Sequence, residues 1–399
     1  MKDRFGAIVS FLGLKRSIVG LLTMVVLVGL GEKMAERFLP LYLIALGASP
    51  LIPGLLNGLD NLLSALYSYP GGWLTERLGY KRALAVFNLV AMGGFLIVIA
   101  FPHWIAVVVG SVFFLSWTAL SLPATMELVS TVLPKNKRTM GVSVHSLVRR
   151  IPMALGPVIG GVLIDLYGVT TGVRLSFTVA FLLGAVSLLF QQGMIEDRSE
   201  KKEPSAGGLR ALIALMPKEL KALLASDMLI RFCEQIPYAY LALWAMQSPQ
   251  GARVSGTEFG ILTAIEMVVA LLIYVPVAYL ADKGEKKPLV LITFFNFTLF
   301  PVVLLFSTGF TMLVVAFVVR GLKEFGEPTR KALIMDLAPE GKKAATFGSY
   351  YLVRDSVVSL AAFAGAWLWQ VSPAVNLLTA AACGAAGTLL FAVTGKERA

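Results

Sequence analysis

The feature that most constrains this sequence is its series of long apolar runs, which alternate with short polar segments. A helix needs roughly 20 apolar residues to cross a bilayer, and we identify twelve runs of that order. The apolar share of the chain, 57%, exceeds the roughly 45–50% of a soluble domain. We therefore expect an all-α polytopic membrane protein. The expected spans cover 17–46, 50–74, 82–101, 104–131, 139–165, 172–192, 221–247, 257–281, 288–307, 310–335, 344–370 and 374–394.

The expected spans fall into two sets of six around one long polar segment. This arrangement predicts two helical bundles, 1–192 and 221–399, joined by a cytoplasmic linker at 193–220. The two sets also repeat, because Leu147-Val-Arg-Arg aligns with Leu352-Val-Arg-Asp without a gap. An internal repeat of six expected spans predicts two pseudo-symmetric six-helix bundles related by an axis along the membrane normal.

The net charge of +11 comes from basic residues in the short segments between the apolar runs. This distribution argues against a nucleic-acid partner and follows the positive-inside rule instead. It predicts that both termini are cytoplasmic and that the chain lies in the cell inner (plasma) membrane. The basic N-terminus and the long first run predict an inserted first helix rather than a cleaved signal peptide.

The sequence offers little support for an enzyme. Cys233 and Cys383 both lie in apolar runs, so we expect neither a disulfide framework nor a metal site. No Gly-x-x-x-x-Gly-Lys-Ser/Thr run is present in the sequence, which argues against ATP as the driving ligand. We find no nucleophile–base pairing, and we expect no bound cofactor.

Ionisable residues inside the first expected span mark a candidate site. Glu32, Lys33, Glu36 and Arg37 interrupt a run that starts near Ile18. A charge near the bilayer centre costs several kcal/mol unless it faces protein or an aqueous cavity. We therefore expect these side chains to face the interior of the protein.

The seventh expected span carries an equivalent stretch. Placing Glu36 on Glu234 puts Lys33 on Arg231. The same register puts Tyr42 on Tyr240. A basic residue three positions before a glutamate on two equivalent helices predicts a polar site to which both halves contribute.

The tenth expected span is the most polar. Its charged residues recur at steps of three, one, three and three, which keeps them on one stripe of a continuous helix. We expect Lys323, Glu324 and Glu327 to face a central cavity, and Arg330 to lie near the inner surface. Arg320 completes the stripe, and Glu266 adds a carboxylate on the eighth span.

Charged residues toward the inner ends of two further spans predict a bracing or gating role. Arg354 and Asp355 lie on the eleventh span, beside Tyr350 and Tyr351. Arg149 lies on the fifth span, four residues after His145 and next to Arg150. Ion pairs formed by such residues could brace helices, and could break when the two halves move.

The segment Gly72-Trp-Leu-Thr-Glu-Arg-Leu-Gly-Tyr-Lys-Arg82 resembles the cytoplasmic loop signature of the major facilitator superfamily. A second copy, from Ala278 to Lys287, contains Asp282. The resemblance implies the fold of that superfamily, two six-helix bundles that rock around a central site, and a monomer. It also implies a conformational latch, in which the small first residue permits close helix approach. The latch residues would be Gly72, Glu76, Arg77, Gly79, Lys81, Arg82 and Asp282.

Two shorter motifs resemble subgroups of the same superfamily. Gly156-Pro-Val-Ile-Gly-Gly161 on the fifth span is similar to the Gly-Pro-x-x-Gly-Gly of its exporters. Glu36-Arg37-Phe38 is similar to the end of the Glu-x-x-Glu-Arg-Phe motif of proton-coupled peptide transporters, although Glu32 here precedes Glu36 by four residues.

The combined features predict a secondary active transporter that moves a small polar solute, anionic or zwitterionic, by alternating access. We expect protons as the coupling ion, carried by Glu36 and Glu234, then by Glu327 and Glu324. The partners would be a small-molecule substrate, protons and the lipid bilayer. A proton-coupled multidrug exporter for lipophilic cations, or a non-transporting membrane sensor with the same fold, are the alternatives. The expected substrate-binding residues are Lys33, Arg37, Arg231, Tyr42, Tyr240 and Lys323.

Overall fold

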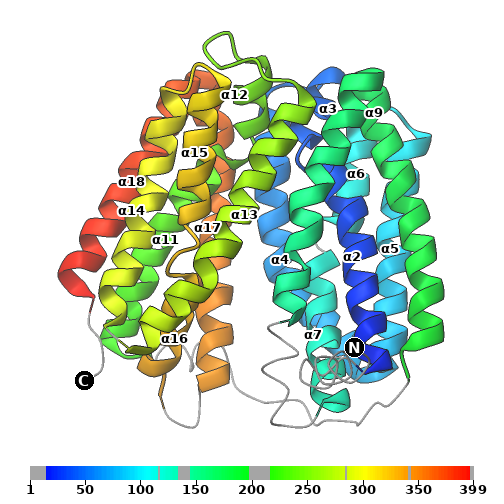
Figure 1. Cartoon of the computed structure of the whole chain (residues 1–399), viewed down its shortest axis with the longest axis horizontal. Helices are drawn as coiled ribbons and strands as arrows, with labels where there is room; N and C mark the ends of the chain where they lie inside the picture. The colour runs from blue at the N-terminus through cyan, green and yellow to red at the C-terminus, as the bar shows by residue number, and fades with distance from the viewer. Residues whose placement is uncertain are drawn as a thin grey trace, which may run out of the picture. The chain divides into compact units, whose positions relative to one another are not determined.

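A computed structural model describes residues 15–115, 117–133, 144–196, 216–283, 285–339 and 343–395, and this part of the chain contains helices and no strand. The predicted all-α fold is confirmed (Figure 1). The chain divides into two compact units. Most of the expected linker lies outside the described residues, and the boundaries at 192 and 220 stay a prediction. Unit 1 comprises Met1–Gly47 and Leu63–Glu203, and unit 2 comprises Ala48–Leu62 and Pro204–Ala399.

One helix, α4, is divided between the two units: its residues up to Leu62 belong to unit 2, and those from Leu63 on belong to unit 1. Residues 144–148 are also helical. The labelled helices of unit 1, α4 included, are α2 (Arg16–Glu36), α3 (Leu39–Ala45), α4 (Leu51–Leu78), α5 (Tyr80–Ala100), α6 (Trp104–Phe114), α7 (Trp117–Val132) and α9 (Arg150–Met194).

The helices of unit 2 begin after the polar segment, together with the first residues of α4. They are α11 (Lys218–Tyr238), α12 (Leu241–Gln247), α13 (Gly256–Lys283), α14 (Lys286–Leu305), α15 (Phe310–Leu322), α16 (Glu327–Leu337), α17 (Lys343–Val371) and α18 (Pro373–Thr394).

Seven helices of the described chain are long and apolar enough to cross a membrane by length and composition. Three stretches that the sequence predicts as single spans are each two helices in succession. The first expected span is α2 and α3, the seventh is α11 and α12, and the tenth is α15 and α16. In α9, by contrast, two expected spans join at Gly168, whose φ of 77° makes the turn that glycine permits. The count of twelve spans stays a prediction.

The first expected span is interrupted where its charges lie. α2 ends at Glu36, and α3 begins at Leu39 with Pro40 in its first turn. A proline has no backbone N–H and its ring clashes with the carbonyl four residues earlier, so a helix ends before it or begins with it. The break therefore follows from a sequence signal, and it places Arg37 in the connecting turn.

In unit 1, α2 packs along α9 through glycines (Figure 1). A Cβ atom at Gly31 would lie 2.6 Å from Cα of Ala180, and one at Gly156 would lie 2.8 Å from Cβ of Lys33. A Cβ atom at Gly160 would overlap the carbonyl oxygen of Met34. Small residues allow membrane helices to approach closely. The Gly-Pro-x-x-Gly-Gly motif thus holds α9 against the charged turn of α2.

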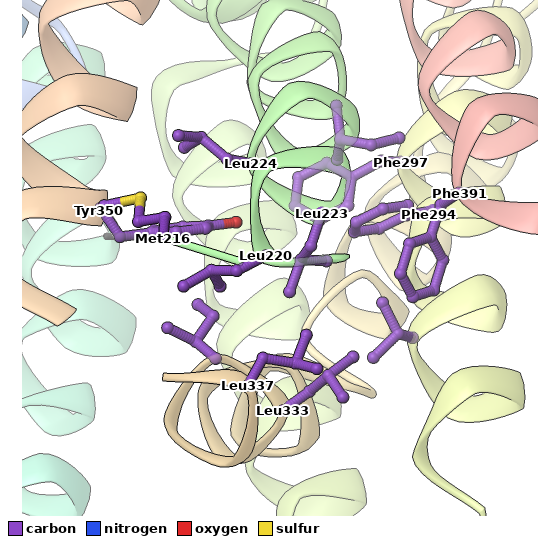
Figure 2. Packing of buried hydrophobic residues seen from close by; sticks show 13 residues of the cluster. Met216, Leu220, Leu223, Leu224, Phe294, Phe297, Leu333, Leu337, Tyr350 and Phe391 are labelled. Carbon is purple, nitrogen blue, oxygen red and sulfur yellow. The ribbon is translucent and has the colours of Figure 1, made fainter. Parts of the chain in front are cut away.

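In unit 2, large apolar side chains from five helices meet below the middle of α11 (Figure 2). Leu220 and Leu223 of α11 face Phe294 of α14 and Leu333 of α16, and Tyr350 enters from α17. This cluster fixes the lower turns of α11 against its neighbours. It thereby positions the polar residues of the next turns, which begin at Asp227.

The α2–α9 contact generates a stability prediction. Gly160→Ala should lower the free energy of unfolding by about 1–3 kcal/mol, because the added Cβ forces two packed helices apart. The matched control is Gly93→Ala in α5, where a Cβ would meet no atom within 4 Å. Alanine is favoured over glycine in a helix by roughly 0.5–1 kcal/mol, so the control should be neutral or stabilised. Calorimetric melting of the detergent-purified protein measures both, and equal melting temperatures would contradict the packing argument.

Candidate functional site

Lys33 is the centre of the charged group in unit 1. Its Nζ lies 3.3 Å from Oε1 of Glu32 and also pairs with Glu36, three residues later on the same helix. The three side chains are mostly buried, with exposed fractions of 5% to 17%. Sequence reasoning noted Glu32 but gave it no role, whereas the structure makes it a second carboxylate on the same ammonium group.

Arg231 plays the corresponding central part in unit 2. Its Nη1 lies 2.6 Å from Oε2 of Glu234, and its Nη2 lies 3.3 Å from Oε2 of Glu327. Its Nε is 3.9 Å from Oδ1 of Asp227. The helical spacing of three and four residues brings two of these carboxylates to the arginine, and α16 supplies the third.

Glu234 bridges Arg231 to a second cation. Nζ of Lys323 lies 2.6 Å from Oε1 of Glu234 and 3.6 Å from Oε1 of Glu266. The same Glu266 oxygen lies 3.1 Å from Nε of Arg320. The ion pairs therefore continue from α11 to α15 and α13. The structure brings together four residues that the sequence selected for one site: Arg231, Glu234, Lys323 and Glu327.

Asp227 is a central member of this network, and sequence reasoning missed it. It is fully buried and pairs with Arg330 of α16, while Nη1 of Arg354 lies 3.4 Å from its Oδ2. The Tyr350 hydroxyl donates to the same oxygen at 3.0 Å. The available signal was its position four residues before Arg231 in a largely apolar run, where an acid needs a cationic partner.

The tenth expected span is not a continuous helix, so the predicted single stripe of five charges is wrong. α15 ends at Leu322 and α16 begins at Glu327, with turns between them. Proline at 328, in the first turn of α16, cannot continue a helix from the preceding turn. Lys323 is thus the C-cap of α15 and Glu327 opens α16. Each charge sits at the helix end whose dipole favours it.

The residues predicted to brace or gate lie at different places. In unit 2, Nη2 of Arg354 lies 2.7 Å from Oδ1 of Asp355, and its guanidinium stacks over the Tyr351 ring at 4.2 Å. In unit 1, Arg149 precedes the first residue of α9 and is electrostatically coupled to Glu32. Their aligned positions in the sequence repeat therefore have different surroundings.

The two tyrosines that the repeat aligns are both buried. The Tyr240 hydroxyl donates to the carbonyl oxygen of Pro50 at 3.0 Å, and its ring stacks on Trp369 at 4.5 Å between centroids. The Tyr42 hydroxyl has no hydrogen-bond partner among the described residues. Their assignment to substrate binding stays a prediction.

The loop motif forms the tight connection from α4 to α5. Gly79, with φ 77° and ψ 154°, is the single residue between the helices, and Nζ of Lys81 donates to the carbonyl of Gln192 at 3.0 Å. Glu76, Arg77 and Arg82 are exposed. The side chain of Asp282 lies outside the described part of the chain.

The close approach expected at Gly72 occurs one residue earlier. A Cβ atom at Gly72 would meet no atom within 4 Å, whereas one at Gly71 would lie 2.6 Å from the carbonyl oxygen of Leu120. The expectation was wrong because residues one apart on a helix face different directions, and Gly71 is the one that faces α7.

The chain is similar to membrane transporters over most of its length. A family profile described as Major Facilitator Superfamily matches residues 21–248 and 228–399. An uncharacterized MFS-type transporter of Methanocaldococcus jannaschii is 20% identical over 88% of this chain and 87% of its own length. Multidrug resistance protein MdtG of Enterobacter lignolyticus is 26% identical over 66% of this chain, and the match spans 64% of that relative, less than two thirds.

Solved structures share the fold. The nucleoside transporter NupG has a TM-score of 0.80 at 12% identity, covering 95% of this chain and 100% of that chain. A POT family transporter in complex with 5-aminolevulinic acid has a TM-score of 0.74 at 13% identity, covering 93% and 95%. At these identities the likeness is one of fold, and it confirms the all-α transporter fold that the sequence predicts.

The buried network generates a second stability prediction. Asp227→Asn should cost about 3–5 kcal/mol of unfolding free energy, because it leaves buried arginines without their carboxylate. The matched control is Asp336→Asn, which breaks a partly exposed pair with Lys286 and should cost at most about 1 kcal/mol. Chemical unfolding in detergent measures both, and a cost for Asp227→Asn as small as that of the control would contradict a central role for Asp227.

Proposed function

The chain belongs to the major facilitator superfamily, and from this premise we propose that it is a secondary active transporter of a small anionic or zwitterionic solute. Membership makes it a multi-pass membrane transporter rather than an enzyme. The finer proposal is that transport proceeds by alternating access, with the two halves rocking around a central site. We also propose a monomer in the inner (plasma) membrane, with both termini cytoplasmic, on the positive-inside argument.

The observation that carries the solute class is the chemistry of the mid-span cations. Arg231, at 17% side-chain exposure, lies within α11, and Lys323, at 7%, lies at the interruption of the expected tenth span. Both offer several N–H donors and no acceptor, which suits a carboxylate or other oxyanion. A POT family transporter of the same fold has been solved with 5-aminolevulinic acid, a molecule with an amine and a carboxylate. Together these points support Lys33, Arg37, Arg231 and Lys323 as the solute-binding cations, and we propose Tyr42 and Tyr240 as further binding residues.

We propose that the carboxylates paired with these cations carry the proton. Glu234 shares its two oxygens between Arg231 and Lys323, and Glu36 pairs with Lys33. Protonation of such a carboxylate would weaken its ion pairs and release the cations to an anionic solute; loss of the proton would restore the pairs. Burial disfavours the charged carboxylate whereas neighbouring cations favour it, so occupancy by solute and by proton would be linked. Glu327 and Glu324 are the next candidates.

Rocking of the two halves during alternating access would require ion pairs that open and close. We propose this role for the loop motif from Gly72 to Arg82, with Asp282 in the second copy, and for Arg149, Arg354 and Asp355. We also propose that 1–192 and 221–399 are the two bundles and that 193–220 links them, because each repeat would then move as a rigid body.

A multidrug exporter is the second candidate, and the similarity to MdtG favours it. Its solutes would be lipophilic cations held by the carboxylates, and the ion pairs of Arg231 and Lys323 would then be structural. A non-transporting sensor with the same fold would bind a solute without moving it.

Ligand binding distinguishes the solute classes. In calorimetric melting of the purified protein, organic anions, amino acids, peptides, phosphorylated metabolites and lipophilic cations are tested separately. We expect a small anion or zwitterion at 100 times its dissociation constant to stabilise the protein by about 2.7 kcal/mol. Arg231→Ala should abolish this shift, and Arg253→Ala, which removes an exposed arginine, should retain it. Stabilisation by lipophilic cations alone would establish the exporter class instead.

Flux in reconstituted vesicles tests proton coupling. We expect Glu234→Gln and Glu36→Gln to lose uptake driven by a pH gradient but to retain solute counterflow, because exchange needs no net proton movement. Glu258→Gln is the control, since Gln can keep the capping contact that Glu258 makes with the Ser255 backbone N–H at 2.8 Å. If both site variants kept pH-driven uptake, the proton assignment would be wrong. An absence of any net flux would favour the sensor.

A further inference from the structure

Unit 1 contains a partly open pocket that the ion pairs described above do not fill. The space between its lining atoms is about 440 Å³, and this figure includes the part that is open to solvent. α2, α7, the helical residues 144–148 and the start of α9 supply its walls. The polar lining includes Glu32, Lys33, Trp117, Thr125, His145 and Arg149.

Arg149 brings a positive charge to this cavity without a carboxylate in contact. Among the described residues, none of the ion pairs within 4.0 Å includes its guanidinium, although the charge of Glu32 acts on it from further away. Glu32 forms an ion pair with Lys33, and Lys33 forms a second ion pair with Glu36. A guanidinium offers five donors in a planar fork and no acceptor, and within a membrane-spanning bundle it requires water or an anion.

Trp117 adds a second unused donor. Its side chain is 5% exposed, and its Nε1 has no hydrogen-bond partner among the described residues. An indole N–H can only donate, and buried polar groups are almost always hydrogen-bonded. Trp117 and Arg149 thus both require an acceptor, and both line the same cavity.

The remaining walls combine apolar side chains with the hydroxyl groups of Thr118 and Ser121. Val25, Leu122, Pro152 and Met153 line the cavity beside these donors. An apolar pocket with a few convergent polar groups is the usual form of a small-molecule site. A single unpaired guanidinium matches one carboxylate in a bidentate pair, whereas a dianion would need a second cation that is not already shared by two carboxylates.

We propose that this cavity binds the carboxylate of a monoanionic solute with a small apolar body, through Arg149 and the Trp117 indole N–H. The inference rests on the proposed function and narrows its solute class to monocarboxylates. It also adds a binding role for Arg149 to the gating role proposed above. Thr125 and His145 would supply further polar contacts around the carboxylate.

Three matched probes test the proposal on the full-length protein in detergent. Benzoate combines a carboxylate with a small apolar body, benzamide has the same shape without the charge, and phenylphosphonate carries a larger anionic group. Titrations followed by calorimetric melting, at constant ionic strength, give an apparent dissociation constant for each. We expect stabilisation by benzoate, none by benzamide, and weaker stabilisation by phenylphosphonate.

Two variants assign the effect to the cavity. Trp117→Phe keeps the ring and removes the N–H, so it should weaken benzoate binding by about tenfold, the effect of one hydrogen bond to a charged group. Arg149→Gln should remove the benzoate shift. The controls are Trp104→Phe in α6 and Arg150→Gln, which do not line the cavity and should keep the wild-type dissociation constant.

Several outcomes would overturn the proposal. These are equal stabilisation by benzamide, tighter binding of phenylphosphonate, or unchanged benzoate affinity in both Trp117→Phe and Arg149→Gln. Failure of the proposed function would look different, because vesicles would then show no net flux of any solute whether or not benzoate binds. Conversely, flux of another solute together with no carboxylate binding would refute this inference alone.

Discussion

The structure depends on one constraint: a charge placed within a bilayer-spanning bundle must find a partner of opposite sign. In the described part of unit 2, a carboxylate lies within 4.0 Å of each of Arg231, Arg320, Lys323, Arg330 and Arg354. These pairs join α11, α13, α15, α16 and α17. Some of the carboxylates are shared, so that one carboxylate, such as that of Asp227 or Glu234, pairs with more than one of these cations.

Interrupted helices make this arrangement possible. Lys323 ends α15 and Glu327 opens α16, so the partial charges of two helix ends favour the side chains beside them. In a continuous tenth helix both residues would lie in the middle of the helix, with no helix end beside them. Buried ion pairs of this kind contribute little net stability, because desolvation offsets much of their attraction. Their value to a transporter would lie in exchange, since a proton or a solute could take the place of either partner.

The two halves have diverged in how they satisfy the same constraint. Lys33 holds two carboxylates of its own helix, whereas Glu234 holds cations from two helices. Arg149 and Arg354 align in the sequence repeat, but Arg354 contacts Asp227 and Asp355, and Arg149 has no such contact in the described chain. In this chain the two repeats therefore share the positions of these charges but not their pairing. The unequal pairing leaves donors available in unit 1.

The sequence by itself determined the all-α membrane class, the transporter superfamily and the positions of the charged turns, because apolar runs, loop signatures and misplaced charges are local patterns. It also selected Arg231, Glu234, Lys323 and Glu327, which the structure brings together. It missed the central place of Asp227, the interrupted tenth span, the packing of Gly71 rather than Gly72, and the cavity at Trp117. Only the tertiary structure decided these, since pairing, close approach and enclosed space depend on which helices meet and on which face each residue is turned.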